Sequence, residues 1–277
     1  MEKIAVVTDT GSNLSFAQAK ELGIYLLPLQ ITIDETTYQD TLEISTQDIY
    51  NELANGKMPK TSMAAYQKIY DLFEELKKDY DTIFAVPLTN GLSTNASTMQ
   101  SIARELEMNV HVIDMYATCA LEKHVAIWIK KLVDEHKSSE EILKIIQPAI
   151  DESNSLILVK NLQHLKRGGR LTPMAAALAG LLKIYPVLHI NKSTEGRIDV
   201  LNKVRTEKRA DAYAIDKIMD DIDIIHSNFL EGADHFKKCF IEKGVPEQNI
   251  HIDYISSVIA VHTGLGCIAI QYIRKEN

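Results

Sequence analysis

Cysteine is scarce in this chain of 277 residues, and the spacing of the few cysteines excludes two of their usual roles. Cys119, Cys239 and Cys267 are odd in number and far apart, so they form neither a disulfide framework nor the closely spaced pair of a zinc site. The histidines and acidic residues also lack an HExxH motif or any other metal-ligand spacing. The sequence therefore predicts no bound metal and a reducing, cytoplasmic compartment.

Glycine, proline and positive charge are also low in this sequence. The 12 glycines and 7 prolines exclude collagen-like and low-complexity chains. Acidic residues number 38 against 30 lysines and arginines, which gives a net charge of −8. Because phosphate backbones repel a negative chain, we expect no nucleic-acid partner.

The sequence shows neither a secretion signal nor a membrane anchor. The N-terminus, MEKIAVVTD, lacks the basic stretch and long apolar core of a signal peptide. The longest uncharged run is Tyr254–Ile273, but it contains His262, Thr263, Gly264 and Gly266. These polar groups would be left unsatisfied in lipid, so we predict that this run is buried backbone with a polar turn.

The first half of the chain alternates short apolar runs with longer helical patterns. Apolar runs near 4–8 and 82–88 predict buried strands, and each is followed by a loop and a helical pattern. This order is typical of an α/β domain whose mostly parallel sheet is covered by helices on both faces. Since ligands bind at the carboxyl ends of such strands, we expect a site among the loops at 9–13, 59–62 and 89–93.

The second half of the chain has a different pattern of predicted helices and strands. A basic, glycine-rich loop at Lys166–Arg170 precedes Thr172 and Pro173, which predict the start of an alanine- and leucine-rich helix ending near Leu182. Two extended runs around residues 194–196 predict a hairpin, which indicates a mixed sheet. We therefore expect a two-domain α/β protein, residues 1–153 and 154–277, with helices at 206–221 and 231–243 and strands near 156–159, 222–226 and 250–255 in the second domain.

Two motifs approach known catalytic signatures but fall short of them. Asp9-Thr10-Gly11 matches the triplet of aspartic proteases, which need two facing copies, and only one occurs here. We expect it to form an Asx-type turn at the start of the first helix. The segment from Gly91 to Asn95 approaches the G-x-S-x-G nucleophile elbow around Ser93, but Asn95 replaces the last glycine.

Ser93 has two interpretations. As a helix N-cap it would be purely structural. The same geometry also offers free backbone N–H groups and the positive end of a helix dipole, which together form an anion site. Thr61 and Ser62, expected to open another helix, would add hydroxyl donors. Two helix N-termini that meet at one cleft favour a carboxylate or phosphate ligand.

The remaining candidates are basic residues and one histidine. Gly168-Gly169-Arg170 lacks the spacing of a phosphate-binding P-loop, so an ordinary basic turn is the simpler interpretation. A second basic cluster, Lys203–Arg209, would usually be a solvated face. His262 lies in a glycine-rich turn without flanking charge, where a ligand and the backbone can approach closely.

Taken together, these pieces resemble the DegV family of bacterial lipid-binding proteins over essentially the whole chain. The chain departs from the family pattern at Thr94 and Leu265, where glycine and proline are usual, and at Asn90 and Gly11. The segments that match the family's motifs, in order, are VTDTGSNL near the N-terminus, Pro59–Ser62, Gly91–Ser93, Lys166–Leu171, Lys203–Arg205 and His262–Gly264.

The resemblance implies a non-enzymatic protein, without a cofactor, that holds a long-chain fatty acid between its two domains. Members of the family present the fatty acid to the catalytic subunit of a fatty acid kinase, which forms an acyl phosphate for phospholipid synthesis. A transient contact with a membrane is also compatible with the resemblance. The implied site residues are Thr61, Ser62, Ser93 and Thr94 for the carboxylate, and Arg170, Arg205 and His262 for the phosphate or partner side.

Two other functions stay open on the sequence: a hydrolase or phosphotransferase, and a regulatory protein that senses lipid. Ser93 and His262 could form a hydrolase site, although no acidic residue is obviously placed to orient His262. For lipid binding, the alkyl chain needs a long apolar tunnel, and Met174–Leu182 is its expected wall. The alternative is that this helix is plain core.

Overall fold

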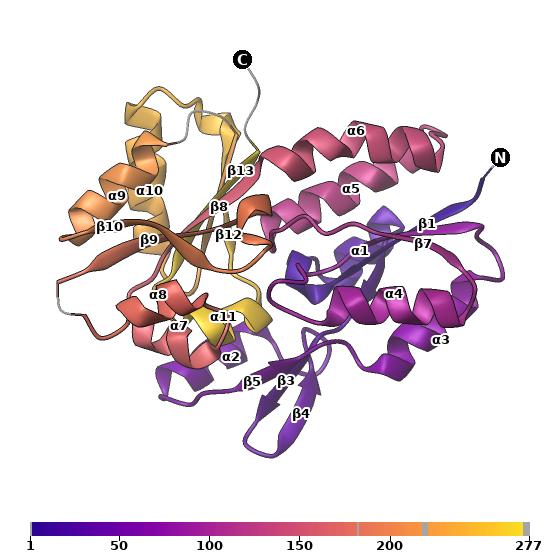
Figure 1. Ribbon diagram of the computed structural model, residues 1–277, viewed down its shortest axis with the longest axis horizontal. Coiled ribbons are helices and arrows are strands. Elements are labelled where there is room, and N and C mark those ends of the chain that lie inside the picture. Colours follow the sequence, from indigo (N-terminus) through magenta and orange to yellow (C-terminus); the bar gives the residue numbers. More distant parts are fainter. Residues whose placement is uncertain (1, 182, 218–220, 274–277) are drawn as a thin grey trace.

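Figure 1 shows a computed structural model of the chain, which describes residues 2–181, 183–217 and 221–273. Two large sheets stand beside each other in it, a parallel one from the first half of the chain and a mixed one from the second. The fold is therefore the α/β arrangement that the sequence predicts. The expected helix end at Leu182 and residues 218–220 of the expected 206–221 helix lie outside the described residues.

The first sheet has four parallel strands and a separate apolar core on each face. Its central strand alternates in the usual way, so Ala5 and Val7 enter one core whereas Ile4 and Val6 enter the other. The strands, in order across the sheet, are β2 (Tyr25–Leu27), β1 (Ile4–Asp9), β6 (Thr82–Val86) and β7 (Asn109–Val112); α3 (Tyr66–Leu76) and α4 (Asn95–Glu105) cover one face, and α5 (Ala120–Asp134) and α6 (Ser139–Glu152) the other.

The turn after β1 forms as predicted from its aspartate. The Asp9 carboxylate accepts a hydrogen bond from the Gly11 amide at 2.8 Å and caps the short 3₁₀ helix η1 (Thr10–Ser12). Helix α1 (Phe16–Leu22) follows, with a capping box between Ser15 and Gln18 at its start. This Asx-type turn confirms the structural interpretation of the DTG triplet.

A small antiparallel sheet contains Thr61 and Ser62, which corrects one prediction. These residues lie in a strand paired with its neighbour, and the next helix begins only at Tyr66. The expected helix N-terminus at residues 61–62 is therefore wrong, because an adjacent strand edge satisfies this backbone in extended form. The sheet consists of β4 (Thr36–Gln39), β3 (Gln30–Ile33) and β5 (Lys60–Ser62), with α2 (Thr46–Ala54) between β4 and β5 in the chain.

The second large sheet has six strands, of which only β11 and β12 pair in parallel. Its two faces bury different helices. The strands, in order, are β10 (Asp199–Val204), β9 (Tyr185–Asn191), β8 (Ser153–Leu158), β13 (Ile268–Ile273), β11 (Ile222–His226) and β12 (Ile250–Tyr254); α9 (Glu207–Asp216) and α10 (Leu230–Glu242) cover one face, and α7 (Leu162–Gly168), α8 (Pro173–Leu178) and α11 (Ser257–Thr263) the other, with 3₁₀ turns η2 (Lys192–Thr194) and η3 (Glu247–Asn249).

Three local predictions in this half need correction. Lys166–Gly168 is the last turn of α7, and Gly169, with φ of 75°, is its left-handed cap, so the basic loop is a helix end. Helix α8 stops at Leu178, well before Leu182. Residues 254–273 contain α11 and β13, so His262 lies in the last turn of a helix. No helix among the described residues is long and apolar enough to cross a membrane.

The two halves share an apolar core. The chain enters the second sheet at Ser153, the residue at which the sequence predicts the end of the first domain. The core between the sheets includes Val7 of β1 and Ile225 of β11, together with Val261 of α11. Helices and strands from both halves of the chain therefore line the space between the two sheets.

Candidate functional site

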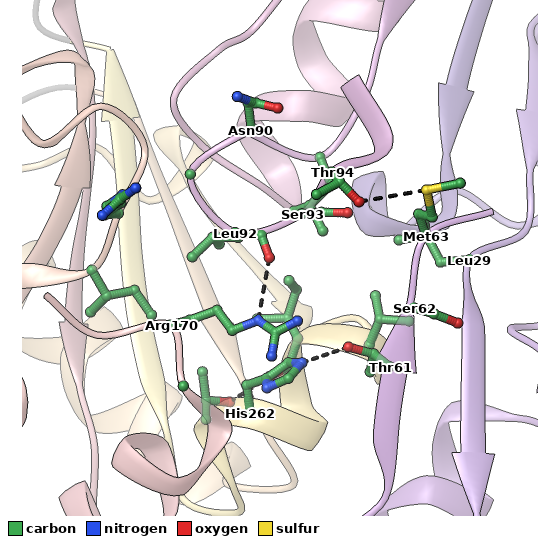
Figure 2. A pocket seen from close by; sticks show the side chains of 18 of the residues that line it. Leu29, Thr61, Ser62, Met63, Asn90, Leu92, Ser93, Thr94, Arg170 and His262 are labelled. Atoms are coloured by element: carbon green, nitrogen blue, oxygen red, sulfur yellow. Dashed lines mark hydrogen bonds between the residues drawn. The ribbon is translucent and has the colours of Figure 1, made fainter. Parts of the chain in front are cut away.

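A pocket of about 570 Å³ opens between the two halves. Strand β5 contributes Thr61, the loop before α4 contributes Ser93, and α11 contributes His262 (Figure 2). Arg205 lies outside this pocket, on the exposed segment after β10. The predicted site residues that line the pocket are Thr61, Ser62, Ser93, Thr94, Arg170 and His262.

Thr61 and His262 form the closest polar contact of the pocket. Thr61 Oγ1 lies 2.6 Å from His262 Nε2, and His262 Nδ1 lies 3.1 Å from the Gly168 carbonyl oxygen. A carbonyl oxygen can only accept, so the Nδ1 atom carries the ring proton. Gly168 is required here, because a Cβ at this position would lie 2.9 Å from His262 Nδ1.

The His262 ring is neutral over the physiological range. Burial lowers its pKa to about 3, and the positive charge of Arg170 acts in the same direction. A neutral ring with its proton on Nδ1 accepts at Nε2, so the Thr61 hydroxyl donates to His262. The Thr61 oxygen can therefore accept a hydrogen bond from a group in the pocket.

The Ser93 hydroxyl, unlike that of Thr61, accepts a hydrogen bond from the protein. Its Oγ accepts a hydrogen bond from the Asn95 amide at 3.2 Å, which leaves the hydroxyl proton free to donate. Helix α4 begins at Asn95, so the positive end of its dipole lies beside this hydroxyl. Ser93 can therefore donate to a carbonyl or carboxylate oxygen, while Thr61 can accept.

The other two predicted hydroxyls are engaged by protein groups. Ser62 Oγ donates to Gln30 Oε1 at 3.2 Å, and neighbouring residues of β5 point to opposite faces. Figure 2 shows the Ser62 side chain turned away from Thr61 and His262. The Thr94 hydroxyl donates weakly to the Met63 sulfur at 3.5 Å. The geometry thus separates Thr61 and Ser93 from Ser62 and Thr94.

Arg170 holds the second half of the pocket against the first. Its Nε donates to the Leu92 carbonyl at 3.3 Å, and its Nη1 donates to the Gly168 carbonyl at 2.8 Å. Partial burial lowers the pKa of the guanidinium, which remains a cation at any ordinary pH. Arg170 therefore supplies a positive charge near His262 and joins the Ser93 loop to α7.

Sequence analysis missed a contact between two glycines. A Cβ at Gly91 would lie 2.3 Å from the Gly196 carbonyl carbon, and a Cβ at Gly196 would lie 2.0 Å from Thr89 Oγ1. The Ser93 loop therefore packs directly on the hairpin turn of the second half. This turn also brings Arg197 to the pocket, a residue that we did not predict. The only hint in the sequence was the glycine within each turn.

An apolar cavity of about 30 Å³ adjoins the polar pocket. Leu92, Ile198 and Ile259 line both spaces, so these side chains lie at the boundary between the pocket and the interior. None of the described residues of the expected tunnel wall, Met174–Leu182, lines either space. The isoleucines that line the inner cavity are Ile157, Ile190, Ile198, Ile225, Ile255 and Ile259.

The geometry does not build a hydrolytic triad around Ser93. His262 Nε2 bonds to Thr61 rather than to Ser93, and His262 Nδ1 faces a backbone carbonyl rather than a carboxylate. A serine nucleophile needs a base within hydrogen-bond reach and an orienting acid behind it. The described residues thus favour binding over nucleophilic catalysis at this site.

Comparison with solved structures gives the same fold over the whole chain. A fatty acid binding DegV family protein from Streptococcus agalactiae superposes with a TM-score of 0.91 and 29% identity, covering 100% of both chains. DegV from Bacillus subtilis, described as a fatty acid binding protein, has a TM-score of 0.83 and 26% identity over 99% of this chain and 100% of that one.

Sequence comparison places the chain in a family. A DegV domain-containing protein of Halalkalibacterium halodurans is 32% identical over 289 residues, which cover 99% of this chain and 100% of that protein. A family model with the description "Uncharacterised protein, DegV family" matches residues 3–275. On this match over nearly its whole length, the chain belongs to the DegV family.

Proposed function

We propose that the protein binds a long-chain fatty acid between its domains, with the carboxyl group at Thr61 and Ser93. The observation that carries this proposal is a hydroxyl-bearing pocket that adjoins an isoleucine-lined cavity. A ligand with one polar end and a long apolar body would match a polar pocket that lies next to an apolar cavity. The Streptococcus agalactiae and Bacillus subtilis relatives, described as fatty acid binding, support it.

The hydroxyl arrangement matches a carboxylic acid without any change. The acid proton would be donated to Thr61 Oγ1, whose own proton is engaged by His262, and Ser93 would donate to the carbonyl oxygen. A carboxylate would need the Thr61 proton to turn toward the ligand, which would leave His262 Nε2 without a donor. The positive charge of Arg170 favours the ionised form, so the two forms compete at this end.

The alkyl chain supplies most of the affinity. Each buried methylene contributes ~0.8 kcal/mol, so a chain of about 14 methylenes contributes roughly 11 kcal/mol before ordering costs. It would enter between Leu92, Ile198 and Ile259 and displace isoleucine side chains around the inner cavity. The tail site would thus have to widen, whereas Thr61 and Ser93 already line the pocket.

We further propose that the bound acid is presented to the catalytic subunit of a fatty acid kinase. That subunit would phosphorylate the carboxyl group to an acyl phosphate, and this chain would contribute no catalytic group. Arg170 and Arg197 lie at the pocket, whereas Arg205 is exposed outside it. Arg205 would therefore serve contact with the kinase rather than retention of the lipid.

The test of binding is mass spectrometry of the organic extract of the purified protein. We expect a single class of long-chain fatty acid, present in wild type and depleted in Thr61→Ala and Ser93→Ala variants that keep the wild-type melting temperature. Both variants retaining as much fatty acid as wild type would refute the assignment of the carboxyl site. An empty wild-type protein that cleaves fatty acid esters would favour a hydrolase instead.

The test of presentation uses stearate-loaded protein, ATP and a bacterial fatty acid kinase catalytic subunit. Arg205→Glu should retain stearate and lose most acyl-phosphate formation, because only the contact with the kinase changes. Loss of stearate with acyl-phosphate formation per bound lipid intact would overturn this role for Arg205.

A further inference from the structure

A buried carboxylate lies directly behind the loop that carries Ser93. Asp9 Oδ2 accepts from the Leu88 amide at 2.9 Å and from Asn95 Nδ2 at 2.7 Å. Leu88 and Asn95 flank the loop of residues 89–94, so one oxygen atom holds both of its ends. The other oxygen, Oδ1, accepts from the Gly11 amide at 2.8 Å.

A second carboxyl group faces Asp9 from the first turn of α5. The Thr8 hydroxyl donates to the Val86 carbonyl oxygen at 2.7 Å and lies 3.2 Å from Glu122 Oε1, and Glu122 Oε2 has no hydrogen-bond donor among the described residues. Asp9 and Glu122 are both fully buried. None of the ion pairs formed by the described chain includes either of them.

One proton must therefore sit between the two carboxyls. Burial raises the pKa of both carboxyls, and the two side chains lie within hydrogen-bond reach of each other. Two such groups cannot both be ionised without a cation, so one of them is protonated and donates to the other. Asp9 receives three N–H donors, which favour its charged form, whereas Glu122 is close only to the Thr8 hydroxyl, which it shares with the Val86 carbonyl oxygen. Burial and, next, the Asp9 charge raise the pKa of Glu122 well above its usual value, in agreement with this assignment.

We propose that protonated Glu122 and ionised Asp9 form a positioning pair that fixes the Ser93 loop for ligand binding. The inference rests on the proposed function, because it takes the Ser93 hydroxyl as a ligand contact. Neither carboxyl touches the ligand. Their role is to hold Leu88 and Asn95, and hence the Ser93 hydroxyl, in place.

The glycine that follows Asp9 is part of the same arrangement. A Cβ at Gly11 would lie 2.7 Å from Asp9 Oδ1 and 3.1 Å from Glu122 Oε2. Any larger residue would push the aspartate out of the position in which it holds the loop. The pair therefore depends on the absence of a side chain at residue 11.

The test compares Asp9→Asn with Glu122→Gln, using cis-parinaric acid displaced by stearate as the probe of affinity. Glutamine can donate to Asp9 as the protonated acid does, so Glu122→Gln should bind within about three-fold of wild type. Asparagine brings an NH₂ group against amide donors, so Asp9→Asn should bind at least ten-fold more weakly. The Leu88 amide should also exchange its hydrogen faster in Asp9→Asn.

Asp114→Asn is the matched control. The Asp114 carboxylate accepts from the Asn90 amide of the same loop at 3.0 Å, but from the solvent side. We expect its affinity to stay within about three-fold of wild type. If Asp9→Asn does not fold, Asn95→Ala removes one donor to Asp9 and should weaken binding by about three- to ten-fold.

Infrared difference spectra of wild type against Glu122→Gln locate the proton without any ligand. The wild type should show the carbonyl band of a protonated carboxylic acid, and its absence would overturn the shared proton. Wild-type affinity and Leu88 exchange in Asp9→Asn, or wild-type affinity in Asn95→Ala, would overturn the positioning role. A wild type that binds no stearate would instead refute the proposed function and leave the spectroscopic result standing.

Discussion

The two ends of the pocket are built on different principles. At the polar end each important side chain has a named partner: Thr61 bonds to His262, and Ser93 accepts from Asn95. At the apolar end six isoleucines are among the residues that line a cavity of about 30 Å³, and an isoleucine side chain makes no directional bond. Directional bonds suit recognition of one chemical group, whereas an adaptable apolar lining suits a chain whose affinity grows with length.

Removing both hydroxyls of the polar end should have the largest effect. Thr61→Val keeps the shape of the threonine and Ser93→Ala removes only an oxygen, so the double variant loses two ligand hydrogen bonds. Thr61→Val also leaves His262 Nε2 without its donor, so the melting temperature of the variant is measured alongside its affinity. Together these are worth about 3 kcal/mol, or a factor of about one hundred in the dissociation constant for stearate measured by calorimetry. Octanoate, with the same carboxyl group, should lose a similar factor.

Ser62→Ala is the control for this variant on the same strand. The Ser62 hydroxyl donates to Gln30 and lies on the opposite face of β5 from Thr61. We expect its stearate affinity to remain within about three-fold of wild type. A loss as large as that of the double variant would show that the two faces of β5 are not functionally distinct.

A larger side chain at the boundary between the polar and the apolar end should weaken the binding of long acids and spare that of short ones. Ile259 lines both the pocket and the inner cavity, so Ile259→Trp should narrow the entry for the alkyl chain. We expect about ten-fold weaker binding of stearate and little change for hexanoate. Ile241→Trp, on the exposed side of α10, should leave both affinities unchanged. Equal losses for both acids in Ile259→Trp would contradict the assigned path.

The smallest expected effect is on the pH dependence of stability. The folded protein holds the pKa of His262 at about 3, below its ordinary value of 6.5, so the unfolded chain binds the proton more readily. Stability is therefore lost as the pH falls through this interval. His262→Gln removes this loss, so the melting temperature gap between variant and wild type should be largest at pH 7.5 and narrower at pH 4.5. A constant gap would contradict a buried, neutral His262.

Sequence patterns predicted well those parts of the fold that depend on local chemistry. The Asx turn at Asp9 and the Thr172–Pro173 helix start both form, because each satisfies backbone groups within a few residues. The helix expected at Thr61 failed because a strand edge distant in the chain satisfies this backbone instead.

The site was predictable only in part, for a related reason. Motifs indicated Thr61, Ser93, Arg170 and His262 one by one, and the structure brings them into one pocket. The bond between Thr61 and His262 spans 201 residues, and no local pattern encodes such a pair. The same holds for the inner cavity, whose isoleucines come from three strands, one helix and two connecting segments and look like ordinary core residues in the sequence.

The Thr61–His262 bond can form only late in synthesis, after the first sheet is complete. The strands of the first sheet all lie within residues 4–112, so that sheet is complete long before α11 emerges. At about 5–20 residues per second, the 201 residues between Thr61 and His262 take about 10–40 s to translate. During this interval the nascent chain presents the Ser93 loop without its partner half. Chains released before residue 257 should contain a folded first sheet and no capacity to carry lipid.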